Sequence, residues 1–179
     1  MVRILIYSLI YLRILVVMAI PFGIGTWFYW WSFYNALYSG IAFGVLMSAI
    51  LGTMHIKGLK KVTSKEIGFN ALRVHQKKVI EIKKGYDEAY LHCLNSLRIL
   101  DVEIEEENKA AGKITAKTSL TPDSFGEFIN IMLTKINSEQ TKINISSKPV
   151  VKVTLIDYGK NLQNIKKMTE LLEQETLET

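Results

Sequence analysis

From Ile14 to Met54 the chain runs for 41 residues without a charged side chain. As one helix this stretch would reach about 60 Å at about 1.5 Å per residue, roughly twice the hydrocarbon thickness of a bilayer. We therefore expect two spans, at about 14–31 and 36–54, joined by a tight turn around Ser32–Asn35. A second span that follows at once also argues against a cleaved signal peptide. The sequence predicts a transmembrane hairpin within residues 1–61.

The charge of the chain is divided unevenly between its two parts. Residues 1–61 contain five Lys or Arg and no Asp or Glu, whereas the remainder contains 17 of each kind, so the formal charge of +5 belongs to the first part. Because basic flanks stay on the cytoplasmic side, both termini are expected in the cytoplasm and the turn outside. We expect this part of the chain to contact the lipid bilayer, and we expect no binding of nucleic acid. The basic flanking residues are Arg3, Arg13, Lys57, Lys60, Lys61 and Lys65.

Aromatic residues mark both expected membrane interfaces. The octet 27–34 holds seven aromatic residues, including every Trp of the chain. Trp and Tyr gather where headgroups meet hydrocarbon, and a base-stacking platform would need basic neighbours that this octet lacks. Residues 2–12 either lie along the membrane surface or continue a long, tilted span that bends near Pro21. The predicted interface residues are Trp27, Trp30, Trp31 and Tyr34 outside, and Tyr7, Tyr11 and Arg13 inside.

The second span carries a small residue at every fourth position, which we call the small-residue ladder: Ala36, Gly40, Gly44, Ser48 and Gly52. Small residues at this spacing line one helix face and let a second helix approach closely. Ala19 and Gly23 form a shorter matching pair in the first span. The ladder either packs the hairpin internally, or mediates homo-oligomerisation or docking on another membrane protein.

After a linker at 62–76, residues 77–179 are expected to form a soluble α+β domain. The predicted order is β-α-β-β-β-β-(β)-α, a two-layer domain of antiparallel sheet with both helices on one face. Acidic Glu103 and Glu105 are expected opposite basic Lys113 and Lys117 across a hairpin. The predicted strands are 77–83, 101–107, 113–118, 125–136 and 141–147, with 150–156 as an extension after Lys148-Pro149; Thr121–Ser124 is a loop, and the helices are 85–99 and 161–175.

One polar stretch, Asp157-Tyr158-Gly159-Lys160-Asn161, precedes the last helix. Asp157 or Asn161 would cap that helix, or Asp157, Tyr158, Lys160 and Asn161 would contact a ligand or partner. Cys93 stands alone, and the three histidines lack metal-ligand spacing. No familiar catalytic motif occurs, so we expect no catalytic residues, no metal and no cofactor. An unrecognised enzyme that uses Asp157, Tyr158 and Lys160 is the alternative.

Several segments of residues 79–172 share a pattern with a known kind of domain: the helix 86–97, Gly112–Ala116, Phe125–Phe128, Ile145–Ser147 and Asp157–Asn161 with Ile165. In these segments the chain resembles small bacterial β-α-β-β-β-β-α domains of helix-grip type. Such domains occur in the lipoprotein of the outer-membrane barrel assembly machine and in an uncharacterised bacterial family. The resemblance implies binding or assembly rather than catalysis. The chain differs from the lipoprotein in its hairpin and in having no lipobox Cys near its start.

Together these features predict a bacterial inner-membrane protein whose hairpin tethers a non-enzymatic binding or assembly domain to the cytoplasmic face. The domain would contact a partner protein, or a lipid or small ligand held between sheet and helices. Three alternatives stay open: a small accessory subunit of a membrane complex docked through the small-residue ladder, the enzyme described above, and a periplasmic domain on a hairpin inserted the other way.

Overall fold

The computed structural model describes residues 2–63, 68–121 and 124–174. The chain divides into two compact units, Met1–Leu72 and Arg73–Thr179, and each is described here by itself. Some sequence expectations lie outside the described residues, namely those on Lys65, on Pro122–Asp123 of the expected loop and on Glu175. The side chain of Arg3 also lies outside them.

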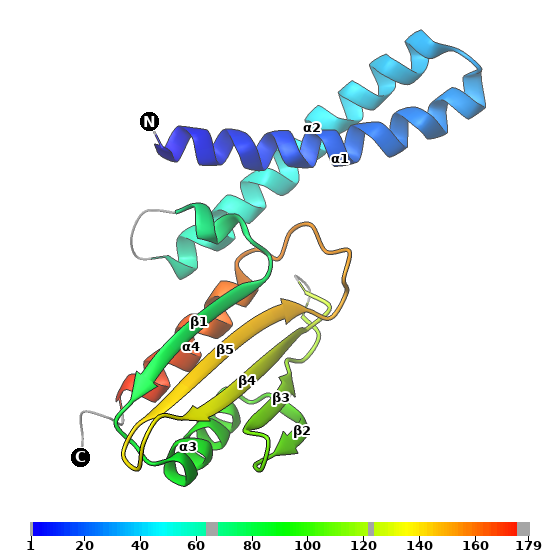
Figure 1. The fold of residues 1–179 in the computed structure, drawn as a ribbon. Helices are drawn as coiled ribbons and strands as arrows, with labels where there is room; N and C mark the ends of the chain where they lie inside the picture. The colour runs from blue at the N-terminus through cyan, green and yellow to red at the C-terminus, as the bar shows by residue number, and fades with distance from the viewer. Residues whose placement is uncertain (1, 64–67, 122–123, 175–179) are drawn as a thin grey trace. The chain divides into compact units, whose positions relative to one another are not determined.

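The first unit is a pair of long antiparallel helices joined by two residues (Figure 1). Helix α1 runs over Val2–Trp30 and α2 over Phe33–Val62, and a 3-10 helix, η1, follows at Phe69–Leu72. Trp31 takes a left-handed conformation with φ of 49°. Ser32 is the N-cap of α2, and its Oγ accepts a hydrogen bond from the backbone N–H of Asn35 at 3.4 Å. The expected turn at Ser32–Asn35 is therefore wrong in position, because Asn35 already belongs to the helix.

Both helices are longer than the spans drawn from the sequence. They contain 29 and 30 residues, and each is long and apolar enough to cross a membrane by length and composition. Residues 2–12 continue α1 without a break, and Pro21 lies inside it. The spans of 14–31 and 36–54 were bounded by charged residues, but charge ends the membrane-compatible segment and not the helix. No proline lies beside Arg13 or Lys57, so the helices continue past both, and α2 also runs through Gly58.

The second unit is built on a five-stranded antiparallel sheet with the strand order β1-β5-β4-β3-β2. Strands β2 to β5 follow one another as a meander, and β1 pairs with β5 at the far edge (Figure 1). Helix α3, Tyr86–Ile99, connects the two edge strands, and α4, Lys160–Gln174, ends the described chain. The strands are β1 Gln76–Ile82, β2 Glu103–Asn108, β3 Lys113–Lys117, β4 Glu127–Lys135 and β5 Thr141–Pro149.

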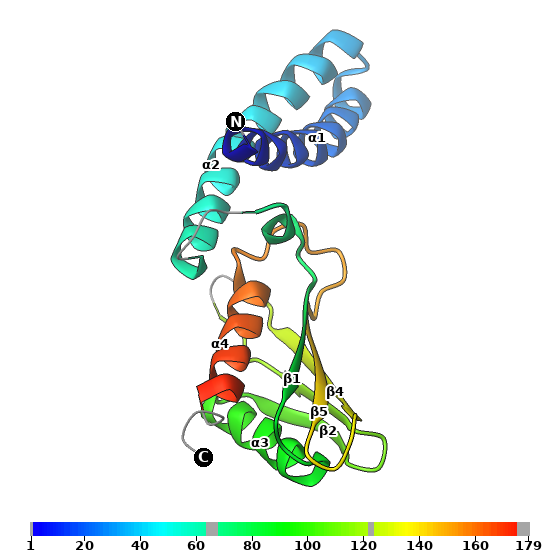
Figure 2. The ribbon, with the colours of Figure 1, turned by 60° about the vertical axis from the view of Figure 1, so that its left-hand side comes forward.

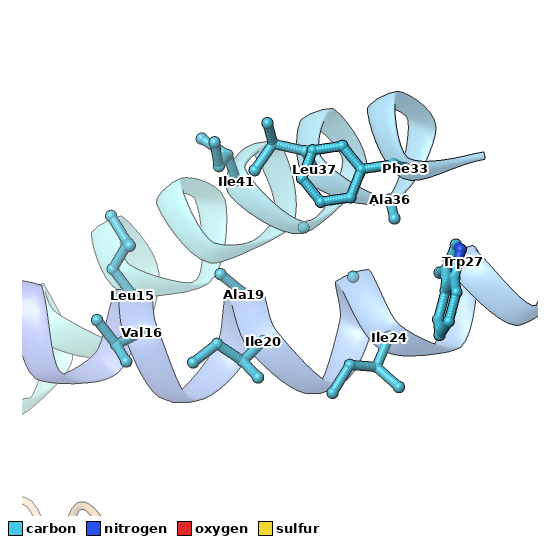
Figure 3. A pocket seen from close by; sticks show the side chains of 12 residues that line it. Leu15, Val16, Ala19, Ile20, Ile24, Trp27, Phe33, Ala36, Leu37 and Ile41 are labelled. Atoms are coloured by element: carbon cyan, nitrogen blue, oxygen red, sulfur yellow. The ribbon is translucent and has the colours of Figure 1, made fainter.

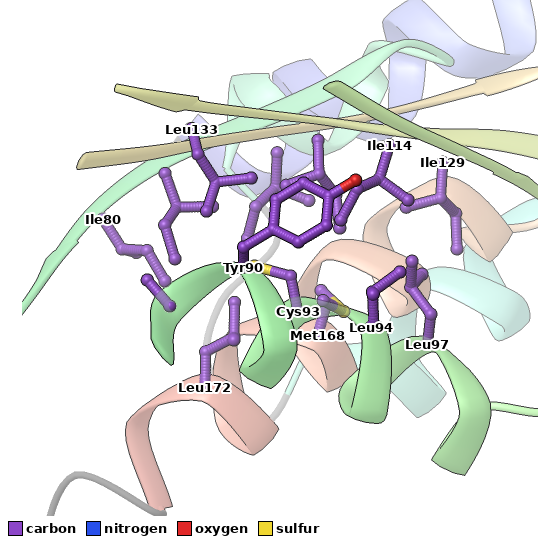
Figure 4. Packing of buried hydrophobic residues seen from close by; sticks show 14 of the residues in the cluster. Ile80, Tyr90, Cys93, Leu94, Leu97, Ile114, Ile129, Leu133, Met168 and Leu172 are labelled. Atoms are coloured by element: carbon purple, nitrogen blue, oxygen red, sulfur yellow. The ribbon is translucent and has the colours of Figure 1, made fainter. Parts of the chain in front are cut away.

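Helices α3 and α4 cover the same face of the sheet, which confirms the predicted two-layer α+β arrangement (Figures 2 and 4). The buried residues of α3 recur at the three- and four-residue spacing of a helix. Strands β4 and β5 contribute every second residue to the core between sheet and helices. Gly112 has a φ of +67° in the turn between β2 and β3, where a side chain would meet the carbonyl oxygen of Leu133. The core contains Tyr90, Cys93, Leu94, Leu97, Ile114, Ile129, Ile131, Leu133, Ile143, Ile145, Ile165, Met168 and Leu172.

Two local expectations about the sheet are wrong, and a third is confirmed only in part. Lys148-Pro149 was expected to interrupt the strand, but β5 continues through Lys148 and ends at Pro149. Proline lacks the N–H of a ladder hydrogen bond, and at the last position of the strand no later pair depends on that N–H. Residues 150–156 form a turn, in which Thr154 N–H bonds Val151 O at 3.1 Å, and no strand. As expected, Lys117 lies opposite Glu103 and 3.8 Å from Glu105. A register shift between Ile104 and Glu106 moves the rest of β2, so Lys113 pairs with Glu106 at 2.6 Å and not with Glu103 or Glu105.

Candidate functional site

Asp157 lies buried beside the first turn of α4 and is 5% exposed. Its Oδ1 accepts the backbone N–H of Gly159 at 3.1 Å, and its Oδ2 accepts the backbone N–H of Asn161 at 3.1 Å. The turn that permits these bonds has positive φ at Tyr158, 52°, and at Gly159, 82°. The carboxylate thus satisfies two donors at the start of the helix, where orphan N–H groups and the helix dipole favour a negative charge.

Asn161 carries the hydrogen-bond chain from Asp157 into the sheet. Its Nδ2 donates to Asp157 Oδ2 at 2.9 Å, and its Oδ1 accepts from Ser147 Oγ of β5 at 2.7 Å. Ser147 Oγ in turn accepts from Asn164 Nδ2 at 3.2 Å. Asn161 and Ser147 are fully buried, so these bonds replace water and fix α4 to β5.

The chain of hydrogen bonds that begins at Asp157 ends at Glu127. Glu127 is the first residue of β4 and is 4% exposed. Its Oε2 accepts from Thr118 Oγ1 at 2.6 Å and from Asn164 Nδ2 at 3.5 Å, and its Oε1 accepts from Ser124 Oγ. We call the set Asp157, Asn161, Ser147, Asn164 and Glu127 the buried polar chain. The carboxylates of Asp157 and Glu127 both accept hydrogen bonds from groups of the same domain.

The buried polar chain only partly coincides with the sequence candidates. It includes Asp157 and Asn161, whereas Tyr158 and Lys160 are half-buried residues outside the bonds described above. Ser147, Asn164 and Glu127 were not among the candidates predicted from the sequence. A signal for Glu127 was present, because it alternates with Ile129, Ile131 and Leu133 on the inward face of β4. The arrangement joins helix, sheet and loop at one end of the domain; a ligand role for Asp157, Tyr158, Lys160 and Asn161 stays a prediction.

The small-residue ladder of α2 faces α1 of the same chain. Ala36, Gly40, Gly44, Ser48 and Gly52 are all buried. A methyl group at Gly44 would lie 2.9 Å from Leu15 O, and one at Gly52 would lie 2.6 Å from the ring of Tyr11. Contacts this close require that no side chain intervene, which explains the small residues. In the single chain, the face that could serve docking on another protein is covered by α1.

Hydrogen bonds between the two helices are distributed along the hairpin. Ser48 Oγ donates to Tyr11 O at 2.7 Å, and Tyr11 Oη lies 3.1 Å from Thr53 Oγ1. Nearer the turn, Thr26 Oγ1 lies 2.7 Å from Ser39 Oγ. Tyr11 was expected only as an interface residue, but its side chain faces α2. In an apolar surrounding such bonds add to the packing that holds two helices together.

The aromatic octet surrounds the turn with its rings exposed, Trp31 by 77% and Tyr34 by 71%. Trp27 lies at the edge of an apolar groove of about 470 Å³ between α1 and α2 (Figure 3). Ala19 and Ala36 line this groove, as do Leu37 and Ile41. At the other end of the hairpin Lys60 Nζ lies 5.6 Å from the ring centroid of Tyr7, and Arg13 is exposed. The predicted depth of these residues in a bilayer stays a prediction.

Metal-binding and thiol chemistry find little support in the described residues. Among them, no group of three His, Cys, Asp or Glu side chains could hold a metal ion. Cys93 is buried in the core, and its burial raises the pKa of the thiol to about 12. A thiol with so high a pKa stays protonated and is a poor nucleophile.

No protein-family model matches the chain, and no curated protein matches its sequence. Among solved structures it is similar to an uncharacterised protein from Bacillus thuringiensis, with a TM-score of 0.45, 11% identity and coverage of 57% of this chain and 98% of that one. It is also similar to the protein XoxI from Bacillus cereus, with a TM-score of 0.44, 15% identity and coverage of 59% and 96%. A START superfamily protein from Mycobacterium smegmatis gives a TM-score of 0.40, 7% identity and coverage of 58% and 97%. Similarity at this level assigns no function to the chain, and the resemblance to the barrel-assembly lipoprotein stays a prediction.

Proposed function

We propose that α1 and α2 insert as a hairpin into a bacterial inner membrane and tether the α+β domain to its cytoplasmic face. There the domain acts as a non-enzymatic binding or assembly module that contacts a partner protein. The observation that carries the proposal is the exposure of large apolar side chains along both helices. In the most apolar 18-residue windows of the two helices, only 17% and 22% of the residues are buried.

The exposed face of α2 is apolar. Its inward face is the small-residue ladder, while Val45 is 52% exposed, Leu46 57% and Ile50 47%. Soluble proteins rarely expose contiguous apolar patches of more than a few hundred Å². A bilayer removes this cost, because lipid tails solvate Val, Leu and Ile as well as a protein core does.

The proposed orientation follows from charge. Lys57, Lys60 and Lys61 are exposed in the last turns of α2, and the aromatic octet occupies the opposite end of the hairpin. Basic residues stay on the cytoplasmic side, and Trp and Tyr anchor a helix end among headgroups. The α+β domain follows α2 in the chain and lies, in this proposal, on the same side as these lysines.

A binding role is favoured over catalysis by the state of the buried polar chain. The carboxylates of Asp157 and Glu127 accept internal hydrogen bonds, which stabilise the fold and leave them poorly placed as general bases. These bonds join α4 to β5 and β4 and make one end of the domain rigid. A rigid end whose two carboxylates already accept internal hydrogen bonds suits recognition of a partner better than proton transfer.

Charged substitutions on exposed residues test membrane insertion. At a position exposed to water, an introduced charge changes the stability of the protein very little. At a position exposed to the lipid interior, each introduced charge costs about 2.5–3.5 kcal/mol of insertion free energy. We expect Val45→Asp with Ile50→Asp to reduce the carbonate-resistant membrane fraction severalfold. The matched control is Val79→Asp with Met132→Asp, at positions of the sheet that are 50% and 44% exposed, and it should leave the fraction unchanged. Equal fractions for both double variants would refute insertion.

A further inference from the structure

The face of the sheet opposite α3 and α4 carries a concentration of positive charge around one aromatic ring. Phe128 of β4 pairs with Lys148 of β5 on one side and with Lys117 of β3 on the other. Both ammonium groups lie 6.0 Å from the centroid of the Phe128 ring. This distance is within the range of a cation–π interaction, so the ring helps to hold the two lysines over it.

A third lysine extends this group to the edge of the sheet. Lys77 of β1 is exposed and pairs with Ser146 of β5, which lies two residues before Lys148 on the same face of the sheet. The pKa of neighbouring His75 is lowered, first by partial burial and then by the charges of Lys77 and Lys148, which places all three side chains in one positive field. We call Lys77, Lys148 and Lys117, with Phe128 between the last two, the basic stripe.

The stripe is poorly neutralised within the chain. Among the described residues Lys77 and Lys148 make no ion pair, and Lys117 has only the long contact of 3.8 Å with Glu105. Like charges gathered on one surface repel one another and raise the local potential. An anionic partner that neutralises them removes this repulsion, so the stripe favours binding of negative charge.

The width of the stripe limits what kind of anion it fits. From β1 to β3 it spans three strand spacings, about 14 Å at about 4.8 Å each. Next to Lys117 lies the acidic strand β2, where Glu103 is the direct partner of Lys117 and Glu105, Glu106 and Glu107 follow. A flat anionic bilayer would meet these carboxylates together with the lysines and be repelled. A single extended chain segment is narrow enough to contact the lysines alone.

We propose that the basic stripe is the docking surface for an acidic segment of a partner protein, which lies across β1, β5, β4 and β3 on the open face of the sheet. Carboxylates of the segment pair with Lys77, Lys117 and Lys148. The row of the sheet that begins at Lys77 continues with Ser146, Asn130 and Thr115, which offer hydrogen bonds to the backbone or amide groups of the segment. This inference rests on the proposed function as a partner-binding module and specifies the chemistry of the partner.

The test uses the full chain in nanodiscs of neutral phosphatidylcholine and a fluorescein-labelled decaglutamate peptide, with binding followed by anisotropy. We expect the triple variant Lys77→Gln, Lys117→Gln and Lys148→Gln to weaken binding at least tenfold. The control removes three other exposed lysines, Lys135→Gln, Lys142→Gln and Lys167→Gln, and should change the affinity less than twofold. Wild-type binding should weaken as salt is raised, because the contacts are exposed ion pairs.

Three outcomes would overturn the proposal: no peptide binding by the wild type, equal weakening in the two triple variants, or complete displacement of the peptide when phosphatidylglycerol is added to the nanodiscs. The last outcome would assign the stripe to the membrane surface. Entry of the chain into nanodiscs, measured by size-exclusion chromatography, reports separately on the hairpin. If the chain stays outside the nanodiscs, membrane insertion fails, and the same titration in solution still decides the role of the stripe.

Discussion

Gly40 of α2 packs directly on Gly23 of α1: a methyl group added at Gly40 would lie 3.1 Å from the Cα of Gly23 and 2.8 Å from the carbonyl oxygen of Ala19. The obstacles are backbone atoms, which cannot rotate away as a flexible side chain can. The hairpin therefore depends on the absence of a side chain at Gly40. By contrast, a methyl group at Gly25 of α1 would meet nothing within 4 Å.

The contrast between Gly40 and Gly25 gives the first prediction. Gly40→Ala should lower the stability of the hairpin by about 1–3 kcal/mol, because the added methyl group forces the helices apart. Gly25→Ala adds the same methyl group in open space and should raise stability by about 0.5–1 kcal/mol through better helix propensity. Unfolding of the full chain in mild detergent, titrated with sodium dodecyl sulfate, measures both. A neutral Gly40→Ala would contradict the close packing.

The second prediction compares two tyrosines of α3. Tyr90 is 1% exposed, and its hydroxyl has no hydrogen-bond partner among the described residues (Figure 4). Tyr86 Oη donates to Lys109 O at 2.6 Å. Tyr90→Phe should therefore raise stability by about 0.5–1.5 kcal/mol, and Tyr86→Phe should lower it by a similar amount. Urea unfolding followed by circular dichroism measures the difference, and a destabilised Tyr90→Phe would imply a partner for that hydroxyl.

The third prediction concerns Asn161 in the buried polar chain. Asn161→Ala removes bonds to Asp157 and Ser147 and leaves both without that partner in a dry site, so we expect a loss of about 2–3 kcal/mol. Asn144 lies exposed on the outer face of β5, and Asn144→Ala should cost less than about 0.5 kcal/mol. The same urea titration measures both variants. Similar losses would show that the chain of bonds contributes nothing specific.

The fourth prediction concerns Cys93, whose pKa is raised by burial to about 12. The unfolded chain releases the thiol proton above about pH 8.5, whereas the folded state keeps it up to about pH 12. The free energy of unfolding therefore has its full value below about pH 8.5 and falls as the pH rises towards about 12. At pH 8 the native thiol should react with iodoacetamide at least a hundredfold more slowly than in urea. Mass spectrometry of the labelled chain measures both rates, and fast native labelling would place Cys93 outside the core.

The sequence predicted the elements better than their ends. Apolar periodicity located α3 and α4, because Tyr90, Cys93 and Leu97, and Ile165, Met168 and Leu172, recur at helical spacing and are all buried. Alternation located the strands in the same way. It failed at 150–156, where Val151 and Val153 alternate with polar residues but are exposed in a turn. Alternation predicts a strand only where a partner strand is present to pair with it.

Long-range polar contacts were beyond the sequence. Glu127 and Asn164 are 37 positions apart, and Asn164 can bond both Glu127 and Ser147 only because β4, β5 and α4 meet at one end of the domain. The basic stripe was hidden for the same reason, since Lys77, Lys117 and Lys148 lie on three strands that the register brings together. The small-residue ladder was visible because its residues share one helix, and its packing against Ala19 and Gly23 of α1 was one of the two alternatives that the sequence offered.

The proposed membrane hairpin has both of its ends in the cytoplasm, and cysteine labelling decides this orientation. Because Cys93 is buried, single cysteines introduced as Ser32→Cys at the turn and as Glu173→Cys at an exposed position of α4 can be labelled selectively. A membrane-impermeant maleimide applied to intact spheroplasts should label the chain with Ser32→Cys, and should label the chain with Glu173→Cys only after permeabilisation. Labelling of Glu173→Cys from outside intact spheroplasts would contradict the account.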